Sequence, residues 1–227
     1  EDKTTLKNIS FSIKSGEKVA IIGASGSGKT TISQLIAGFY AKNSGDILYN
    51  DISIDNISKK SLREHLFLVL QMPILFNNTL RFNLTMGENI SNEKIKEALK
   101  IAQLNSMLEN LPDGLDTIVG KMGIRLSGGQ RQRLSIARMI LANPSVVIFD
   151  ESTSALDVQT ETKLFENLEN ILKDKTVITI AHRLSTVKNA SKIFVLEDGE
   201  LVQSGTHMEL EDEIGHYKEF VKHQLLN

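Results

Sequence analysis

A glycine-rich segment that ends in a lysine and two threonines has residue types suited to phosphate chemistry. It fits the pattern G-x-x-x-x-G-K-[ST] and comprises Gly23, Ala24, Ser25, Gly26, Ser27, Gly28, Lys29, Thr30 and the following Thr31. Glycines let backbone N–H groups converge on phosphate oxygens, and a helix N-terminus adds its positive dipole end. In this pattern the lysine reaches the β- and γ-phosphates, and the Thr30 hydroxyl ligates Mg²⁺. The segment therefore predicts a phosphate-binding loop.

A second chemical feature is an apolar run, Val146–Phe149, that ends in the two carboxylates Asp150 and Glu151. The carboxyl ends of parallel strands meet at one edge of a sheet, where ligands bind. We expect Asp150 to lie beside the phosphate loop and to hold Mg²⁺, and Glu151 to orient an attacking water. Two solvated acids capping the next helix are the simpler alternative, but the phosphate loop upstream favours catalysis.

Two further polar residues follow apolar runs in the same way. Gln71 follows Phe67–Leu70, and His182 follows the β-branched run Thr176–Ile180. Each alone is typical of an ordinary polar loop residue. Three strand ends that deliver polar groups to one edge form a constellation, so we expect His182 to contact a γ-phosphate and Gln71 to contact the metal and the attacking water.

A second glycine segment contains Ser127, Gly128, Gly129 and Gln130. Ser127 and Gln130 have the spacing of a capping box, which predicts a helix N-terminus. A capping box does not need two glycines, and glycine weakens a helix start. The glycines indicate that a ligand approaches the backbone closely, and the helix dipole favours an anion.

The order of these motifs is specific. Leu126–Gln130, placed between a phosphate loop and an acidic strand end, resembles the signature sequence of the ATP-binding cassette (ABC) superfamily. Ser154–Asp157 resembles the D-loop of that family, Gln71 its Q-loop glutamine and His182 its switch histidine. The resemblance covers essentially the whole chain and implies an ATPase that uses ATP and Mg²⁺.

The resemblance also implies a partner. Two cassettes of this family pair head to tail, with ATP sandwiched between the phosphate loop of one and the signature of the other. Ser127 and Gly129 would then donate to the γ-phosphate of the neighbour's ATP, and Asp157 would link the two sites. The helical region that carries the signature begins and ends far from the phosphate loop in sequence, which also favours a site shared between chains.

The elements that must position these residues indicate an α/β fold: a P-loop NTPase core with a mostly parallel sheet, an antiparallel β subdomain and an inserted α-helical subdomain. Short apolar runs predict strands buried on both faces at Val19–Ile22, Val146–Phe149, Thr176–Ile180 and Lys192–Leu196. Helical periodicity dominates from 79 to 142. We assign 1–227 to one nucleotide-binding domain, with 1–78 and 143–227 as a RecA-like core and 79–142 as the helical subdomain that carries the signature.

Local patterns predict the remaining elements. Leu6, Ile9, Phe11 and Ile13 alternate with polar residues, which is typical of an antiparallel strand. Turn-forming pairs predict two hairpins, at Asn50-Asp51 and Asp198-Gly199. A terminal amphipathic helix is expected near Tyr217–Leu225.

Composition excludes several classes of protein. The 227 residues contain no cysteine and carry a formal net charge of −2, which rules out a disulfide scaffold and gives no field that would attract nucleic acid. The region between the phosphate loop and the signature lacks a long heptad run, which argues against DNA-repair ABC proteins with coiled-coil arms. An unrelated phosphate-loop kinase would leave the signature unexplained. We therefore expect no nucleic-acid partner.

Several segments resemble the exporter branch of the family. Met72–Phe76 with Thr79 and Asn83 is similar to the exporter stretch that meets the coupling helices of a membrane domain, and Arg131–Arg133 points the same way. The resemblance implies the motor of an exporter at the cytoplasmic face of the membrane, with its transmembrane domain on the same polypeptide, as a start at Glu1 suggests. The second nucleotide-binding domain would come from an identical chain or a paired half-transporter. An importer-type or soluble ABC ATPase remains the alternative.

Two positions depart from the family pattern. The family stacks adenine on an aromatic residue upstream of the phosphate loop, but Phe11 is the only aromatic residue there and is assigned to the core. We expect the stacking residue to precede Glu1. Lys121 stands in Thr117–Gly123 where exporters usually carry an acid, which affects contact with the membrane domain rather than ATP hydrolysis.

Overall fold

The computed structural model describes residues 5–150, 156–181 and 183–225. The described residues of 1–68, 145–151 and 175–227 form one compact unit, and those of 69–144 and 152–174 form a second. The assignment of 1–78 and 143–227 to a core, and of 79–142 to a helical subdomain, stays a prediction.

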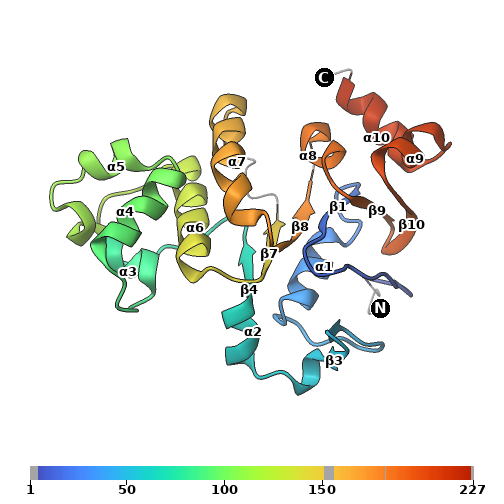
Figure 1. The fold of residues 1–227 in the computed structure, drawn as a ribbon, viewed down its shortest axis with the longest axis horizontal. Helices are drawn as coiled ribbons and strands as arrows, with labels where there is room; N and C mark the ends of the chain where they lie inside the picture. Colours follow the sequence, from blue (N-terminus) through green and yellow to red (C-terminus); the bar gives the residue numbers. More distant parts are fainter. Residues whose placement is uncertain (1–4, 151–155, 182, 226–227) are drawn as a thin grey trace. The chain divides into compact units, whose positions relative to one another are not determined.

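Strands and helices are interspersed along the chain (Figure 1). The strands are β1 (Lys18–Gly23), β2 (Leu48–Tyr49), β3 (Ile52–Ser53), β4 (Leu66–Val69), β5 (Asn78–Thr79), β6 (Ile118–Val119), β7 (Val146–Asp150), β8 (Thr176–Ile180), β9 (Lys192–Glu197) and β10 (Glu200–Gly205). The α-helices are α1 (Lys29–Ile36), α2 (Lys59–His65), α3 (Leu80–Thr85), α4 (Asn92–Ile101), α5 (Asn105–Glu109), α6 (Gly128–Ala142), α7 (Val158–Leu172), α8 (Leu184–Lys188), α9 (His207–Asp212) and α10 (His216–Leu225). Two 3₁₀ turns are η1 (Ile54–Asn56) and η2 (Gly114–Asp116).

The main sheet has the strand order β10-β9-β1-β8-β7-β4. β1 pairs in parallel with β8 and β9, and β7 pairs in parallel with β8, whereas β10 returns antiparallel beside β9. The predicted hairpin at Asp198-Gly199 is confirmed, because both residues have positive φ angles, 46° and 82°, as a tight turn between β9 and β10 requires. The mostly parallel α/β sheet expected from the sequence is present.

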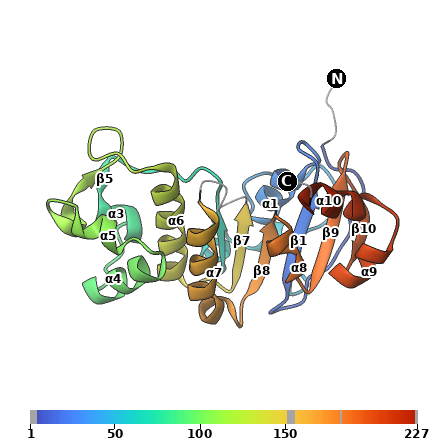
Figure 2. The ribbon, with the colours of Figure 1, turned by 90° about the horizontal axis from the view of Figure 1, so that it is seen from above.

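Alternate residues of the central strands face two separate cores. On one face, Val19 and Ile21 of β1 pack with α1 and α2 through Ile32 and Leu62. On the opposite face, the residues Ala20, Ile22, Ile193 and Val195 pack with α8, α9 and α10 through Leu184, Leu210 and Tyr217. Figures 1 and 2 show α1 and α8 on opposite sides of β1. Burial on both faces explains why these strands are continuous apolar runs in the sequence.

The predicted hairpin at Asn50-Asp51 is also confirmed. β2 and β3 pair antiparallel, with Leu48 opposite Ser53 and Tyr49 opposite Ile52. Asn50 and Asp51 both have positive φ, 47° and 66°. Asn and Asp tolerate this left-handed region better than other non-glycine residues, so the pair closes a two-residue hairpin.

The strand expected over Leu6–Ile13 is wrong. The structure assigns no strand to residues 5–16, yet the side chains of Leu6, Ile9, Phe11 and Ile13 pack against the core that contains α1. The alternation of apolar and polar residues therefore indicates that one side of this segment packs on the core. It does not indicate that the segment pairs with a strand. Phe11 lies in the core as predicted, with its ring centroid 4.6 Å from that of Phe194.

The second unit is built around α4 and α6. Ile95, Ala98 and Leu99 form the predicted apolar face of α4 and are buried, together with Leu134 of α6. The unit also contains α7, whose Leu164 and Leu168 are fully buried, as their helical spacing predicts.

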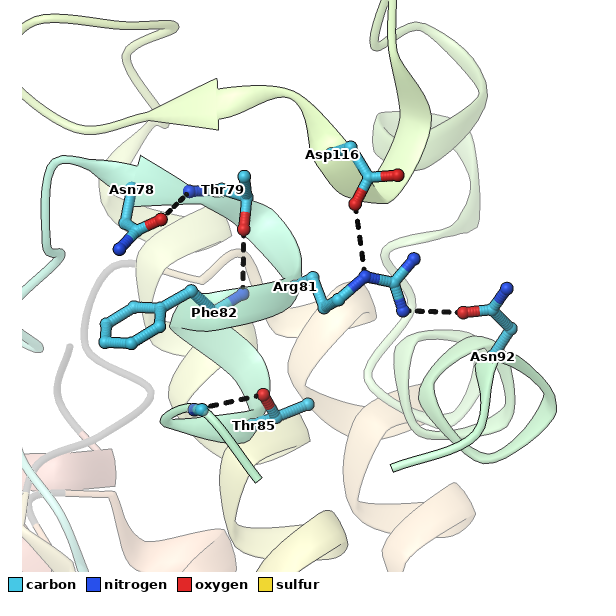
Figure 3. A network of polar contacts seen from close by, with 8 residues as sticks. Asn78, Thr79, Arg81, Phe82, Thr85, Asn92 and Asp116 are labelled. Atoms are coloured by element: carbon cyan, nitrogen blue, oxygen red, sulfur yellow. Dashed lines mark hydrogen bonds and ion pairs between the residues drawn. The ribbon is translucent and has the colours of Figure 1, made fainter. Parts of the chain in front are cut away.

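α3 is held at both of its sides by polar contacts (Figure 3). The Thr79 hydroxyl accepts a hydrogen bond from the Phe82 N–H at 3.0 Å and so caps the helix start. Arg81 extends to the other side, where it donates to Asp116 at 3.1 Å and to Asn92 at 2.6 Å. These contacts tie α3 to η2 and to the start of α4.

Within the described ranges, none of the helices combines the length and apolar character that crossing a bilayer requires.

We predict that Leu99→Ala lowers the free energy of unfolding by about 2–5 kcal/mol, because it leaves a cavity in a fully buried site. Lys100→Ala, at the exposed neighbouring position of α4, should change it by no more than about 0.5 kcal/mol. Urea unfolding of the two variants measures the difference. Equal losses for the two variants would contradict the assignment of this face to the core.

Candidate functional site

The phosphate loop joins β1 to α1, as its motif predicts. β1 ends at Gly23, and Gly28 caps α1 in a left-handed conformation with φ 102°. The Lys29 ammonium is buried and donates to the carbonyl oxygens of Gly23 at 2.9 Å and of Ala24 at 2.8 Å. The loop therefore curls around its own lysine, which places a positive charge at the start of α1.

Two features of this loop fit a bound phosphate chain. A Cβ added to Gly23 would lie 2.2 Å from the Leu196 carbonyl oxygen, so only glycine lets the loop leave the sheet at this point. The Ser27 hydroxyl is buried, and no residue in the described part of the chain gives it a hydrogen-bond partner. A buried hydroxyl without a partner is costly unless a ligand supplies one.

Asp150 lies beside this loop, at the end of β7. It pairs in register with Ile180 of β8, which in turn pairs with Ile21 of β1, so the carboxyl ends of three strands meet here. The Thr30 hydroxyl lies 3.4 Å from one carboxylate oxygen of Asp150, and the Ser33 hydroxyl lies 3.0 Å from the other. Hydroxyl and carboxylate oxygens are ligands that Mg²⁺ prefers, so this pair fits the metal that the motif implies.

Ser33 is a site residue that the sequence analysis missed. It lies three residues after Thr30 and therefore on the same face of α1, and it is fully buried. Its hydroxyl has two acceptors in reach, the Thr30 carbonyl oxygen at 2.8 Å and the Asp150 carboxylate at 3.0 Å, so it can donate its single hydrogen to Asp150 and hold that carboxylate beside Thr30. The i, i+3 spacing of two hydroxyl residues after the loop lysine was the available signal.

Of the other residues predicted at strand ends, the structure describes Gln71 but not Glu151 or His182. Gln71 follows β4 in the second unit, where its side chain is exposed and its carbonyl oxygen accepts from Gln132 Nε2 at 3.1 Å. Glu151 and His182 lie outside the described residues, as do Ser154 and Ala155 of the D-loop segment. Their predicted roles stay predictions.

The second glycine segment forms the start of α6, and the predicted capping box is confirmed. The Ser127 hydroxyl accepts from the Gln130 N–H at 3.2 Å, and the Gln130 side chain accepts from the Ser127 N–H at 2.8 Å. The N–H groups of Gly128 and Gly129 have no acceptor within the described ranges. Two open amide groups on residues that lack side chains suit an anion.

Asp157 caps α7, with its carboxylate 2.9 Å from the Thr160 N–H. This bond and the Thr160 hydroxyl hold the pKa of Asp157 below its usual value. Arg133 of α6 is half buried, which lowers its pKa, while the charge of Asp157 acts in the opposite direction. Arg133 also donates to the Gln103 carbonyl oxygen at 2.5 Å. Asp157 at the start of α7 therefore attracts the charge of Arg133 in the second turn of α6.

An exposed apolar surface lies on the same unit. β5 and β6 pair antiparallel, and the Met122 N–H donates to the Asn77 side chain at 3.1 Å, so 77–79 and 118–122 lie side by side. Exposed side chains on these two segments are Met72, Ile74, Phe76, Ile118 and Met122. Several exposed large apolar side chains on neighbouring segments of the chain are typical of an interaction site.

Comparison with known proteins assigns the family. Residues 6–154 match the family described as ABC transporter. The chain is 46% identical over 217 residues to an "ATP-dependent lipid A-core flippase" of Chromobacterium violaceum, covering 95% of this chain and 37% of that protein. It is also 46% identical over 214 residues to a "putative multidrug export ATP-binding/permease protein" of Staphylococcus aureus, covering 94% of this chain and 37% of the relative.

Among solved structures, a bacterial Atm1-family ABC exporter with ATP bound matches with a TM-score of 0.91 and 39% identity, covering 97% of this chain and 39% of that one. The chain thus spans less than two fifths of the length of each of these relatives. The relatives' names favour the exporter interpretation over the importer alternative. The chain therefore belongs to the ABC transporter family, and it is an ATP-binding ATPase domain of the exporter type.

Proposed function

We propose that this chain is the motor domain of an exporter, in which ATP binding and hydrolysis by a head-to-tail dimer drive substrate export. The observation that carries the proposal is the presence of two half-sites on one chain. One is the phosphate loop with Asp150 in the first unit, and the other is the open start of α6 in the second.

In the proposed dimer, each ATP is held by the phosphate loop of one chain and by the signature of the other. Gly23–Thr31 binds the phosphates, with Lys29 turning from the loop carbonyls to the β- and γ-phosphates. Ser127 and the amides of Gly128 and Gly129 donate to the γ-phosphate held by the partner, and Gln130 fixes Ser127 by the capping box. Asp157, at the start of α7, would link the two sites, as its place in a D-loop-like segment implies.

The hydrolytic step is assigned to residues at the carboxyl ends of the strands. Glu151 orients and accepts a proton from the attacking water, while His182 contacts the γ-phosphate and Gln71 contacts the water and the metal. Thr30, Asp150 and Gln71 are the residues that would hold Mg²⁺, which when bound neutralises charge on the phosphate oxygens. Ser33 keeps Asp150 in position for that role.

The partners follow from the exposed apolar surface on 72–76 and 118–122. We assign this surface to a transmembrane domain, which we expect on the same polypeptide because the relatives are more than twice as long as this chain and one is named a permease. The motor would then lie at the cytoplasmic face of the membrane. The second nucleotide-binding domain is an identical chain or the other half of a paired transporter.

We predict that Glu151→Gln lowers ATP hydrolysis by about 10²–10⁴-fold and traps an ATP-bound dimer, because the amide cannot accept a proton from water. Asp55→Asn, at an exposed carboxylate in the first unit, is the matched control and should hydrolyse ATP at the unaltered rate. Phosphate release and size-exclusion chromatography measure the two effects. Normal turnover in Glu151→Gln would remove the residue from its proposed role.

We predict that Ser127→Ala reduces hydrolysis much more than it reduces stability. Ser91 is the matched control, because its hydroxyl also caps a helix of the second unit, accepting from the Lys94 N–H at 3.4 Å. Each substitution should lower the free energy of unfolding by about 1 kcal/mol through loss of the cap. Only Ser127→Ala should slow phosphate release, by at least about tenfold. Similar hydrolysis rates in Ser127→Ala and Ser91→Ala would show that Ser127 only caps its helix and has no role in hydrolysis.

A further inference from the structure

α6 carries three buried polar residues that the catalytic scheme does not use, Gln132, Ser135 and Arg138, and two of them have long side chains. Gln132 is 3% exposed and Arg138 is 9% exposed, in a helix whose remaining buried positions are mostly apolar. A polar group is buried at a cost that only good hydrogen bonds offset. The partners of these two residues therefore indicate what they do.

Both residues bind the backbone of the segment that follows β4. Gln132 Nε2 donates to the Gln71 carbonyl oxygen at 3.1 Å, and Arg138 Nη1 donates to the Ile74 carbonyl oxygen at 2.9 Å. The two side chains are six residues apart, which is about 9 Å along a helix. α6 therefore holds the segment at two separate points.

A third point of attachment runs through Asn83, which is fully buried in α3. Arg138 donates through Nε to the Asn83 carbonyl oxygen and through Nη2 to its side-chain oxygen at 3.0 Å. The Asn83 side-chain oxygen also accepts from the Phe76 N–H at 2.9 Å, and its amide donates to the carbonyl oxygens of Phe76 at 2.9 Å and Thr79 at 3.1 Å. The Arg138 guanidinium and the Asn83 side chain together thus bond the backbone of the turn at Ile74, Phe76 and Thr79.

The hydrogen bonds of Gln132, Arg138 and Asn83 connect two parts of the second unit that have separate roles in the proposed function. The segment 72–76 presents the exposed side chains assigned to the transmembrane domain, and the same helix that binds its backbone begins at the signature glycines. Arg138 lies ten residues after Gly128, about 15 Å along α6. Burial lowers the pKa of Arg138 to about 10, so it stays charged at neutral pH.

Separating α6 from the segment would leave a buried guanidinium and several backbone carbonyl oxygens without partners. A rigid helix bonded in this way moves together with the segment instead of sliding past it. We infer that Gln132, Arg138 and Asn83 are positioning residues that make the segment 71–79 and the signature start of α6 move as one body. The inference rests on the proposed function, because it explains how the motor passes the state of its nucleotide to the membrane side.

The test uses the full-length polypeptide that contains this chain and the variant Arg138→Lys. Lysine keeps the charge but lacks the planar fork that reaches Ile74 and both oxygens of Asn83 at once. Hydrogen exchange is followed by mass spectrometry in residues 72–79 and 127–131, with and without ATP plus vanadate. Arg81→Lys is the matched control, because Arg81 lies in the same unit but contacts Asp116 and Asn92 instead of the segment (Figure 3).

In the unaltered protein and in Arg81→Lys, ATP with vanadate should slow exchange about tenfold in both segments. In Arg138→Lys it should still slow exchange in 127–131, but by less than about twofold in 72–79. The kcat for ATP should fall while its KM stays unchanged, because the phosphate loop is intact. If Arg138 only stabilised the fold, Arg138→Lys would raise hydrogen exchange throughout the second unit. ATP with vanadate would then slow exchange in 72–79 and in 127–131 to the same extent.

Gln132→Met removes one donor at nearly constant volume and supplies the answer if Arg138→Lys does not fold. In this variant too, ATP with vanadate should slow hydrogen exchange in 127–131 but by less than about twofold in 72–79. A normal ATP response of 72–79 in the folded variants would overturn the inference. Absence of any ATP response at 127–131 in the unaltered protein would overturn the proposed function, and the inference with it.

Discussion

The first turn of α6 leaves the N–H groups of Gly128 and Gly129 without an acceptor in the described part of the chain. A helix cannot satisfy these groups from within, and the capping box already uses Ser127 and Gln130 for each other. The remaining amides therefore need water or an anion. The proposed shared site follows from that requirement, because an anion that meets it has to come from outside α6.

The rest of the second unit holds that helix start in place. Leu134 anchors α6 in the helical core, Arg133 donates to the Gln103 carbonyl oxygen, and Arg138 and Gln132 bind α6 to the segment after β4. The first unit supplies the complementary half. There the parallel strands bring the phosphate loop and Asp150 to one edge of the sheet, and two hydroxyls of α1 fix the carboxylate. Each unit thus carries one of the two elements to which the proposed function assigns phosphate binding.

Much of this was predictable because it depends on local chemistry. Turn residues predicted both hairpins, since Asn50-Asp51 and Asp198-Gly199 adopt the positive φ angles that their residue types favour. Period and apolar content predicted the central strands and α4. The capping box predicted where α6 starts.

The features that could not be predicted from the sequence depend on contacts between residues far apart in the chain. The alternation of Leu6 to Ile13 correctly indicated burial of one side, but whether a segment finds a pairing strand depends on tertiary structure. Ser33 and Arg138 were not recognised as important, because a hydroxyl or a cation in a helix is usually solvated and only the folded structure reveals its buried partner. The roles of Glu151 and His182, which lie outside the described residues, still rest on sequence alone.

The central claim is that the signature serves a nucleotide held by another chain. It is tested most directly by the ATPase activity of a dimer purified with two affinity tags, one on a Lys29→Ala chain and one on a Ser127→Ala chain. If the sites are shared between chains, the phosphate loop of the Ser127→Ala chain and the signature of the Lys29→Ala chain together form one intact site. The mixed dimer should then hydrolyse ATP well above the rate of either homodimeric variant. A dimer of the double variant with an unaltered chain then has no intact site and should be inactive. The reverse ranking, with activity only in the second dimer, would show that each chain completes its own site and would contradict the account.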